Sequence, residues 1–294
     1  MRRVTDSFDG RREIAYANFS SPCRVKRSRM EMSMNKEQLM KEKSNLINSE
    51  KSFIRNNYKK METSKLQDKI EKYVPDKLET TLEKTFGKAF EVIFENGTPI
   101  IEKMYNREKN EHAYKIREYA ANLKNDKNSV RAFGLRAKGS KGVNIALSAV
   151  EGMGMGILGM GIPDIPVFLS LILKSVYEIS IHYGFEYDSE EEQIFILNII
   201  ETALLHGQEL IAHDEKINQW IEGVFEFKET KEEQIVYTSK ALSDELLYLK
   251  FIQGIPVVGM LGGVSDVLYQ KKISDYAELK YKRRFLEKHM SYTV

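Results

Sequence analysis

The sequence predicts an all-α protein, a single helical domain in which two glycine-rich apolar segments pack together as hairpins. Apolar residues recur every three or four positions in the run after Pro75, which is the period of a helix with one buried face. Ser189 and Thr230 each stand three residues before a glutamate, at the start of an apolar run. That spacing is a capping box, and it indicates a helix N-terminus at each place.

The composition is that of a folded protein of a reducing compartment. Hydrophobic residues make up 42% of the chain and charged residues 30%, as in ordinary globular proteins. Cys23 is the one cysteine, so no intramolecular disulfide can form and the cysteine zinc patterns are excluded. The first residues lack the apolar core of a secretory signal. We therefore expect a cytoplasmic location rather than export.

Residues 1–33 are expected to be a disordered or mis-annotated extension. They hold eight Arg/Lys and four Asp/Glu, which is a net charge of +4. Because the whole chain has a net charge of +2, the remaining residues carry a net charge of −2. The folded part is therefore not a generally basic nucleic-acid binder, and we expect no nucleic-acid partner. Met34 is the expected start of translation, because a charged helical pattern begins there. The alternative is a basic arm that touches acidic lipid or RNA.

Two further regions follow this extension. Residues 34–74 are rich in Lys, Glu, Asn and Gln, which predicts an exposed and weakly packed helical segment with a solvated charged face. Residues 75–294 are expected to form the main helical domain. Its first helix begins at Pro75 and stops at Gly97, and a second spans about residues 99–123. The buried stripe expected on the first helix consists of Leu78, Leu82, Phe86, Phe90 and Ile93.

The middle of the chain is unusually apolar. Residues 143–173 form a run of 31 residues in which Glu151 and Asp164 are the charged ones. A helix needs about 20 apolar residues to cross a bilayer, so the run is long enough. Its five glycines within residues 152–161 would weaken a lone lipid-facing helix, at about 1 kcal/mol each. We therefore expect a re-entrant or core-packed hairpin rather than a simple span.

The helix after this segment has clear end signals. Asp164 is placed to cap its N-terminus, and Pro166 falls in its first turn, where a missing N–H costs little. Gly184 supplies the C-terminal stop. The alternative role for Asp164 is that of a catalytic acid or a metal ligand.

A second glycine-rich apolar stretch occupies residues 254–264 and is expected to pack against the first. The helix that closes the chain is locally basic. Such a run is usually a solvated face, but beside two apolar hairpins it could also meet anionic lipid, at about 1 kcal/mol per basic residue near the surface. The basic residues are Lys271, Lys272, Lys280, Lys282, Arg283, Arg284 and Lys288.

The sequence carries no convincing catalytic or cofactor motif. Signatures of common hydrolases, P-loop proteins and zincins are absent from it. Residues 154–159 match a dinucleotide-binding loop, but no strand precedes them, so that match is discarded. His206 and His213 have a spacing that could share a helical face, yet Gly207 interrupts it. We expect no cofactor and no metal site, and we assign no catalytic residue.

The run from Gly159 to Leu197 resembles the EcsC family of bacterial proteins, in which a glycine-rich stretch leads into an Asp-x-Pro helix ending at Tyr-Gly. Residues 255–277 look like the family's second apolar segment, so the resemblance covers most of the chain from Pro75 onward. The candidate functional or structural motif residues are Gly159, Gly161, Pro163, Asp164, Pro166, Glu178, Tyr183, Gly184, Gly254, Pro256 and Gly259.

The resemblance implies a role at the cytoplasmic membrane, because the family's namesake is encoded beside an ABC transporter. It implies no catalytic residue. The first hypothesis is a non-enzymatic accessory protein, peripheral to the inner face of the membrane, whose partner is lipid or a membrane protein such as that transporter. The alternative is a soluble hydrolase-like enzyme in which Asp164, Glu151 or His182 converge in a pocket near Asp164.

Overall fold

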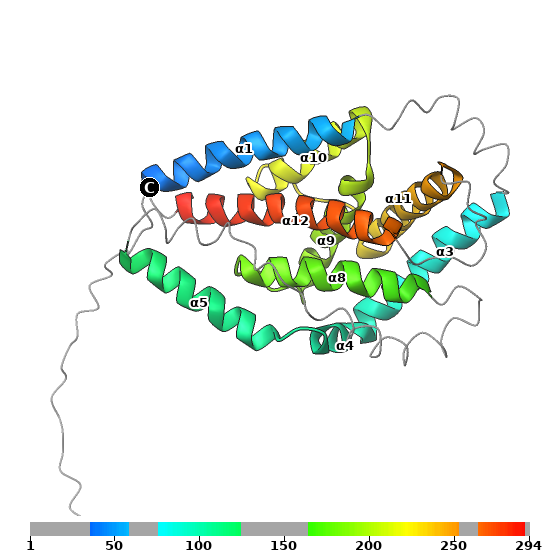
Figure 1. Ribbon diagram of the computed structural model, residues 1–294, viewed down its shortest axis with the longest axis horizontal. Coiled ribbons are helices and arrows are strands. Elements are labelled where there is room, and N and C mark those ends of the chain that lie inside the picture. The colour runs from blue at the N-terminus through cyan, green and yellow to red at the C-terminus, as the bar shows by residue number, and fades with distance from the viewer. Residues whose placement is uncertain (1–35, 59–75, 125–163, 253–263, 292–294) are drawn as a thin grey trace, which may run out of the picture. The chain divides into compact units, whose positions relative to one another are not determined.

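The computed structural model describes residues 36–58, 76–124, 164–252 and 264–291 (Figure 1). Every secondary-structure element in these ranges is a helix, so the all-α prediction is confirmed. The expected packing of the two glycine-rich segments stays a prediction, because most of both lies outside the described residues. The boundaries at residues 33 and 74 lie outside them too.

The helices follow one another without an intervening strand in the described ranges. In chain order they are α1 (Lys36–Tyr58), α3 (Asp76–Val92), the π-helical turn η1 (Ile93–Gly97), α4 (Thr98–Lys103), α5 (Arg107–Lys124), α8 (Asp164–His182), α9 (Glu190–Leu204), α10 (Gly207–Ile221), α11 (Lys231–Ile252) and α12 (Val264–Ser291).

Helices α8, α9 and α12 form the centre of the packing. Figure 1 shows α12 running between α1 and α8, and α12 also packs on α9 and α10. Helix α8 carries α3, α4 and α5 on its other sides, and α11 packs against both α3 and α9. The central helices therefore meet neighbours on several faces, which explains why α9 is buried along most of its length.

Helix α8 is apolar because it lies in the core. Within the described ranges, Ile165–His182 is the one stretch of helix that is long and apolar enough to cross a membrane. The same stretch is 78% buried inside the protein. Its hydropathy is thus accounted for by contacts with other helices.

Helix α1 corrects one expectation. Its residues Leu39 and Leu46 are buried, and so are the polar Gln38, Glu42 and Glu50. The helix packs on α10 and α12. The prediction of an exposed and weakly packed segment is therefore wrong for its described part. Two of the charges that suggested a solvated face, Glu42 and Glu50, are instead partners of cations on α12.

The predicted helices between residues 75 and 124 need a smaller correction. The predicted stripe residues Leu82, Phe86, Phe90 and Ile93 are buried as expected. Gly97, however, does not stop the helix: η1 continues it into α4. The break comes instead at the turn after Lys103. There, the Asn106 side chain accepts a hydrogen bond from the Lys109 N–H at 2.7 Å and so caps α5.

Candidate functional site

Several motif residues lie outside the described ranges. The structure gives no position for Gly159, Gly161, Pro163, Gly254, Pro256 and Gly259. Asp164 is the first residue of α8, and Pro166 is buried in the first turn, as the sequence predicts. The capping role of the Asp164 side chain stays a prediction. The remaining motif residues lie in the second half of α8 and just after it.

Glu178 is a half-buried residue on α8 and pairs with Lys174 one turn earlier. The Lys174 ammonium donates to Glu178 Oε2 at 2.9 Å, and the lysine side chain is 7% exposed. The ion pair lets the core helix carry a lysine without leaving the charge unpaired. Among the described contacts, Glu178 therefore has a structural role, as the ion-pair partner of the buried Lys174.

The Tyr183–Gly184 pair closes α8 and joins it to two other helices. The Tyr183 hydroxyl donates to Glu278 Oε1 on α12 at 2.6 Å, and burial raises the pKa of that hydroxyl. Gly184 has a φ of +80°, in the left-handed region that favours glycine. The Tyr114 ring of α5 lies where a side chain on Gly184 would point. The motif glycine thus provides both a helix stop and room for an aromatic ring.

Helix α5 contacts the end of α8 and α12 through three further polar groups. Arg117 Nη2 donates to the His182 carbonyl at 3.1 Å, which places a cation at the negative end of α8. Glu118 lies 3.3 Å from His289 Nε2 and accepts from the Tyr114 hydroxyl at 2.6 Å. These hydrogen bonds hold the pKa of Glu118 below its usual value.

Arg284 of α12 occupies an aromatic box beside this junction. Its guanidinium carbon lies 4.2 Å from the ring centre of Phe185, 4.5 Å from that of Phe195 and 4.8 Å from that of Trp220. Its Nη1 donates to both oxygens of Glu192, at 2.7 and 2.8 Å. Cation–π contacts contribute about 0.5–2 kcal/mol each, so the arginine is held firmly between α9, α10 and the loop after α8.

A pocket of about 390 Å³ opens over Phe185, next to this box. Ile221, Glu222, Arg284 and Lys288 are among the residues that line it. The pocket is a depression open to solvent rather than an enclosed cavity. Within the described part of the chain, Lys288 forms no ion pair, whereas Arg284 is paired with Glu192. The pocket therefore offers an apolar wall together with exposed charges.

Most of the basic run of α12 is neutralised inside the protein. Lys280 is fully buried, with its ammonium 2.9 Å from Glu50 and 2.7 Å from Asp214. Arg283 also binds Glu50, and Lys282 lies 2.9 Å from Glu42. These three cations are therefore paired within the protein, and the anionic-lipid hypothesis stays a prediction. Their role is to hold α1 and α10 against α12.

The structure separates two of the residues named for the hydrolase alternative, whereas a pocket near Asp164 stays a prediction because residues 125–163 lie outside the described ranges. Asp164 and His182 are the first and last residues of α8, so at a rise of 1.5 Å per residue they lie about 27 Å apart along its axis. They cannot converge in one cavity. The pocket over Phe185 lies close to the His182 end, and Glu151 falls outside the described residues.

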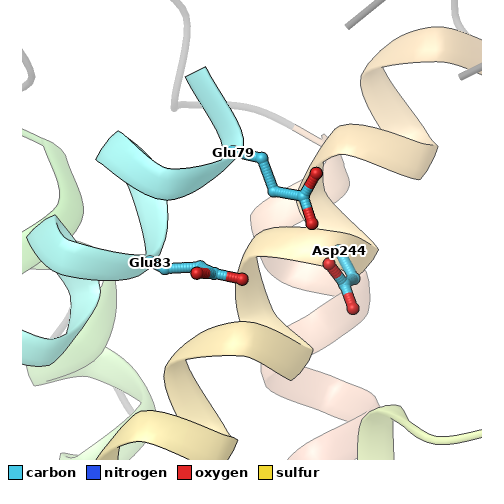
Figure 2. Close-up of side chains that lie close together, drawn as sticks. All are labelled: Glu79, Glu83 and Asp244. Carbon is cyan, nitrogen blue, oxygen red and sulfur yellow. The ribbon is translucent and has the colours of Figure 1, made fainter. Parts of the chain in front are cut away.

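A cluster of carboxylates joins α3 to α11. Figure 2 shows Glu79 and Glu83 of α3 beside Asp244 of α11. One carboxylate oxygen of each residue lies within 4.8 Å of those of the other two. The Lys240 ammonium lies 3.5 Å from Glu79, 3.6 Å from Glu83 and 3.5 Å from Asp244. The Lys240 ammonium therefore supplies, beside the three carboxylates, the positive charge that a bound metal ion would otherwise supply.

The two spaced histidines do not share a site. His206 lies 2.9 Å from the Asn57 carbonyl and 3.2 Å from Glu245. His213 lies 3.8 Å from Glu201 of α9. Burial raises the pKa of Glu201 and lowers that of His213, because it disfavours the charged form of each group. Their spacing in the sequence gives no joint metal site.

No pattern in the sequence predicts the pocket. Phe185, Ile221 and Lys288 come from a loop and the ends of two helices far apart in the chain. Phe185 directly follows the Tyr-Gly motif, and that adjacency is the one clue that sequence reasoning could have used.

Comparison with known proteins fits this arrangement of helices. The model of the EcsC protein family matches residues 37–286, which span the chain from α1 to the last turns of α12. Protein EcsC of Bacillus subtilis (strain 168) is 24% identical over 230 residues, covering 76% of this chain and 86% of that relative. No solved structure matches the chain significantly. The match over most of the chain shows that this protein belongs to the EcsC protein family.

Proposed function

We propose that this protein is a non-enzymatic accessory protein that associates peripherally with the inner face of the cytoplasmic membrane. Its partner there is lipid together with a membrane protein of the ABC-transporter or secretion class. Membership of the EcsC family is consistent with this role. The observation that carries the proposal is the outward face of α5.

The outward face of α5 presents two large apolar side chains. Ile116 is 68% exposed and Tyr119 is 61% exposed. They lie three residues apart, with His112 one turn before Ile116, so the three share one side of the helix. Lys115 is exposed beside them. Tyr114 and Ala121 lie on the opposite side of α5 and are buried, so apolar side chains occupy both the inner and the outer side of the helix.

The size of this face indicates peripheral and reversible contact. Full burial of one such side chain contributes about 1.5–3 kcal/mol, and a basic residue near an anionic surface adds about 1 kcal/mol. That sum supports reversible docking in the plane of the interface, not insertion across the bilayer.

A cell-fractionation experiment tests the proposal. The full chain is compared with the double variant Ile116→Ser/Tyr119→Ser, and membranes are washed with high salt and then with alkaline carbonate. We expect the unaltered chain to sediment with membranes and to be released by carbonate. We expect the α5 variant to shift at least about fivefold toward the soluble fraction, in line with the loss of two apolar contacts.

The control variant is Val236→Ser/Tyr237→Ser on α11. Val236 and Tyr237 are 63% and 50% exposed, so this pair matches the first in size and accessibility. It should leave the distribution unchanged. A chain that is soluble from the start, or two variants that behave alike, would overturn the proposal.

A further inference from the structure

His289 of α12 joins that helix to α5. Its Nε2 lies 3.3 Å from Glu118 Oε1 of α5, and its Nδ1 lies 2.8 Å from the carbonyl oxygen of Phe285, one turn earlier in α12. The imidazole is 11% exposed and the Glu118 side chain 31%, so water has little access to the histidine. Since α5 packs on α8, this pair ties α5 to a second helix.

Both ring nitrogens of His289 face oxygens that can only accept a hydrogen bond. A carbonyl and an ionised carboxylate have no hydrogen to donate, and a neutral imidazole carries one N–H. A protonated imidazole carries two N–H groups and can donate to both oxygens at once. Deprotonation therefore breaks one of the two hydrogen bonds and turns a nitrogen lone pair toward an oxygen.

The charges closest to this ring come from α5 and from α12 itself. Glu118 attracts a positive charge on the ring, and so does the Phe285 ring, whose centre lies 4.2 Å from that of the imidazole. Lys288, the preceding residue, repels such a charge, but its ammonium lies 5.6 Å from the centre of the Phe185 ring. The hydrogen bond between His289 and Glu118 is therefore the contact that most depends on the proton.

The charged or titratable groups that the neighbouring helices bring to this end of α12 have partners of their own. The His182 ring of α8 lies edge-on to Tyr183. The other pairs are Arg117 of α5 with the His182 carbonyl, Tyr183 of α8 with Glu278, Lys43 of α1 with Glu287, Glu192 of α9 with Arg284, and Glu222 after α10 with Arg283.

Glu118 stays ionised over the pH range in which histidines titrate. The hydrogen bond from His289, followed by that from the Tyr114 hydroxyl, holds the pKa of the Glu118 carboxyl below its usual value. The contribution of Glu118 is thus present at neutral pH and is lost only as the pH falls through that lowered pKa. Histidines titrate near pH 6.5, well above carboxyl groups. As the pH rises through that range, the contact weakens because the imidazole loses a proton.

We propose that His289 is a pH-sensitive latch that holds α5 against α12 while its imidazole is protonated. When the pH rises through the histidine range, one hydrogen bond is lost and α5 docks less firmly. Helix α5 carries Ile116 and Tyr119, so the consequence at the membrane rests on the proposed function. A firmly held α5 presents these two side chains in a fixed arrangement, and less ordering is then needed on contact with lipid.

Amide hydrogen exchange along α5 measures the latch without a membrane. Exchange of the full chain is followed by mass spectrometry at about pH 5.5 and about pH 8, on either side of the histidine range. Rates are converted to protection factors, which remove the intrinsic pH dependence of exchange. We expect the protection of residues 107–124 to fall about tenfold at the higher pH, the scale of losing one hydrogen bond to a charged group.

The local measurement is needed because a second histidine has the same arrangement. His206 lies between the Asn57 carbonyl and the Glu245 carboxylate, so the pH dependence of global unfolding would combine the two histidines. The amides of α5 report local opening of that helix. Residues 190–204 of α9, which is buried along most of its length, serve as the reference and should change less.

Three variants locate the latch. His289→Gln removes the titrating group and Glu118→Gln removes the charged acceptor, so each should give α5 the same protection at both pH values. His112→Gln is the control, because His112 is an exposed histidine on the same helix, and it should keep the full pH dependence. Circular dichroism confirms that each variant is folded. A folded His289→Gln variant that keeps the pH dependence would overturn the proposal, as would an unaltered chain that shows none.

Vesicle binding separates this inference from the proposed function. Phosphatidylcholine vesicles, which have no net charge, limit the effect of protonating His112. We expect the unaltered chain to bind them about threefold more tightly at the lower pH, because a held helix needs less ordering, and His289→Gln to bind equally at both. If α5 protection depends on His289 but vesicles do not bind at either pH, the latch stands and the membrane role is wrong. If vesicles bind equally at both pH values, the regulatory role of the latch is wrong.

Discussion

Gly184 stands at the point where the end of α8 meets α5. Its φ of +80° and the position of the Tyr114 ring leave no room for a side chain. Tyr183, the residue before it, ties α8 to α12 through Glu278. Both motif residues therefore position helices, and the exposed charges of the neighbouring pocket belong to residues outside the motif.

Replacing Gly184 by alanine should be costly for two reasons. A left-handed backbone costs an L-residue about 1–2 kcal/mol, and displacing the Tyr114 ring adds about 1–3 kcal/mol. Gly207→Ala is the matched control: its φ is +59°, but nothing lies within 4 Å of an added Cβ. Urea unfolding should show a loss for Gly184→Ala at least about 1 kcal/mol larger than for Gly207→Ala. Equal losses would mean that the ring moves aside freely.

The glycine stop could be predicted from local sequence, because a C-terminal glycine acts through its own backbone. The ring against it could not, since Tyr114 lies 70 residues earlier in the chain. The same holds for Arg284, whose aromatic box draws on Phe185, Phe195 and Trp220. Local patterns predict conformation, whereas these contacts depend on how helices pack.

At the scale of elements, α1 and α12 form an antiparallel pair held by charge. Lys43 binds Glu287 at 2.6 Å, Glu42 binds Lys282, and Glu50 binds Lys280 and Arg283. Residues later in α1 thus pair with residues earlier in α12. The sequence of each helix alone suggests a solvent-exposed charged face. In the structure, each helix supplies the oppositely charged partners of the other.

Removing Glu50 should show that this pairing is essential to the fold. Glu50→Gln leaves the buried Lys280 with one carboxylate fewer and deprives Arg283 of a partner, which costs about 3–5 kcal/mol when a buried pair is broken. Lys271→Gln removes an exposed ion pair with Asp275 and should change stability by less than about 1 kcal/mol. Thermal and urea unfolding measure both. A Glu50→Gln variant as stable as Lys271→Gln would contradict a buried role for the network.

The existence and type of most elements were predictable, since caps and apolar periods are local signals. The box at Thr230 forms as predicted, since Thr230 and Glu233 bond reciprocally. At the other, Ser189 accepts from the Glu192 N–H at 3.2 Å, but the Glu192 carboxylate accepts from Arg284 instead of completing the box. The packing of α1 was not predictable from its composition. In a sequence, a carboxylate that will be buried cannot be distinguished from a solvated one until the cations that pack against it are known.

At the scale of the whole molecule, the family match begins at residue 37 and so includes α1. This agrees with the contacts of α1 on α10 and α12. The apolar α8 is buried and most cations of α12 are paired, so the proposal rests on the exposed apolar side chains of α5. The proposed function therefore depends on Ile116 and Tyr119 entering the interface.

The most direct test places an environment-sensitive fluorophore at residue 116. Cys23, the chain's one cysteine, is replaced by serine, and Ile116→Cys is labelled; Val236→Cys labelled on α11 serves as control. Vesicles of mixed anionic and ethanolamine phospholipid are then added. We expect a blue shift and a rise in emission at residue 116 and no change at residue 236. An unchanged spectrum at residue 116, or the same shift at both positions, would contradict the account.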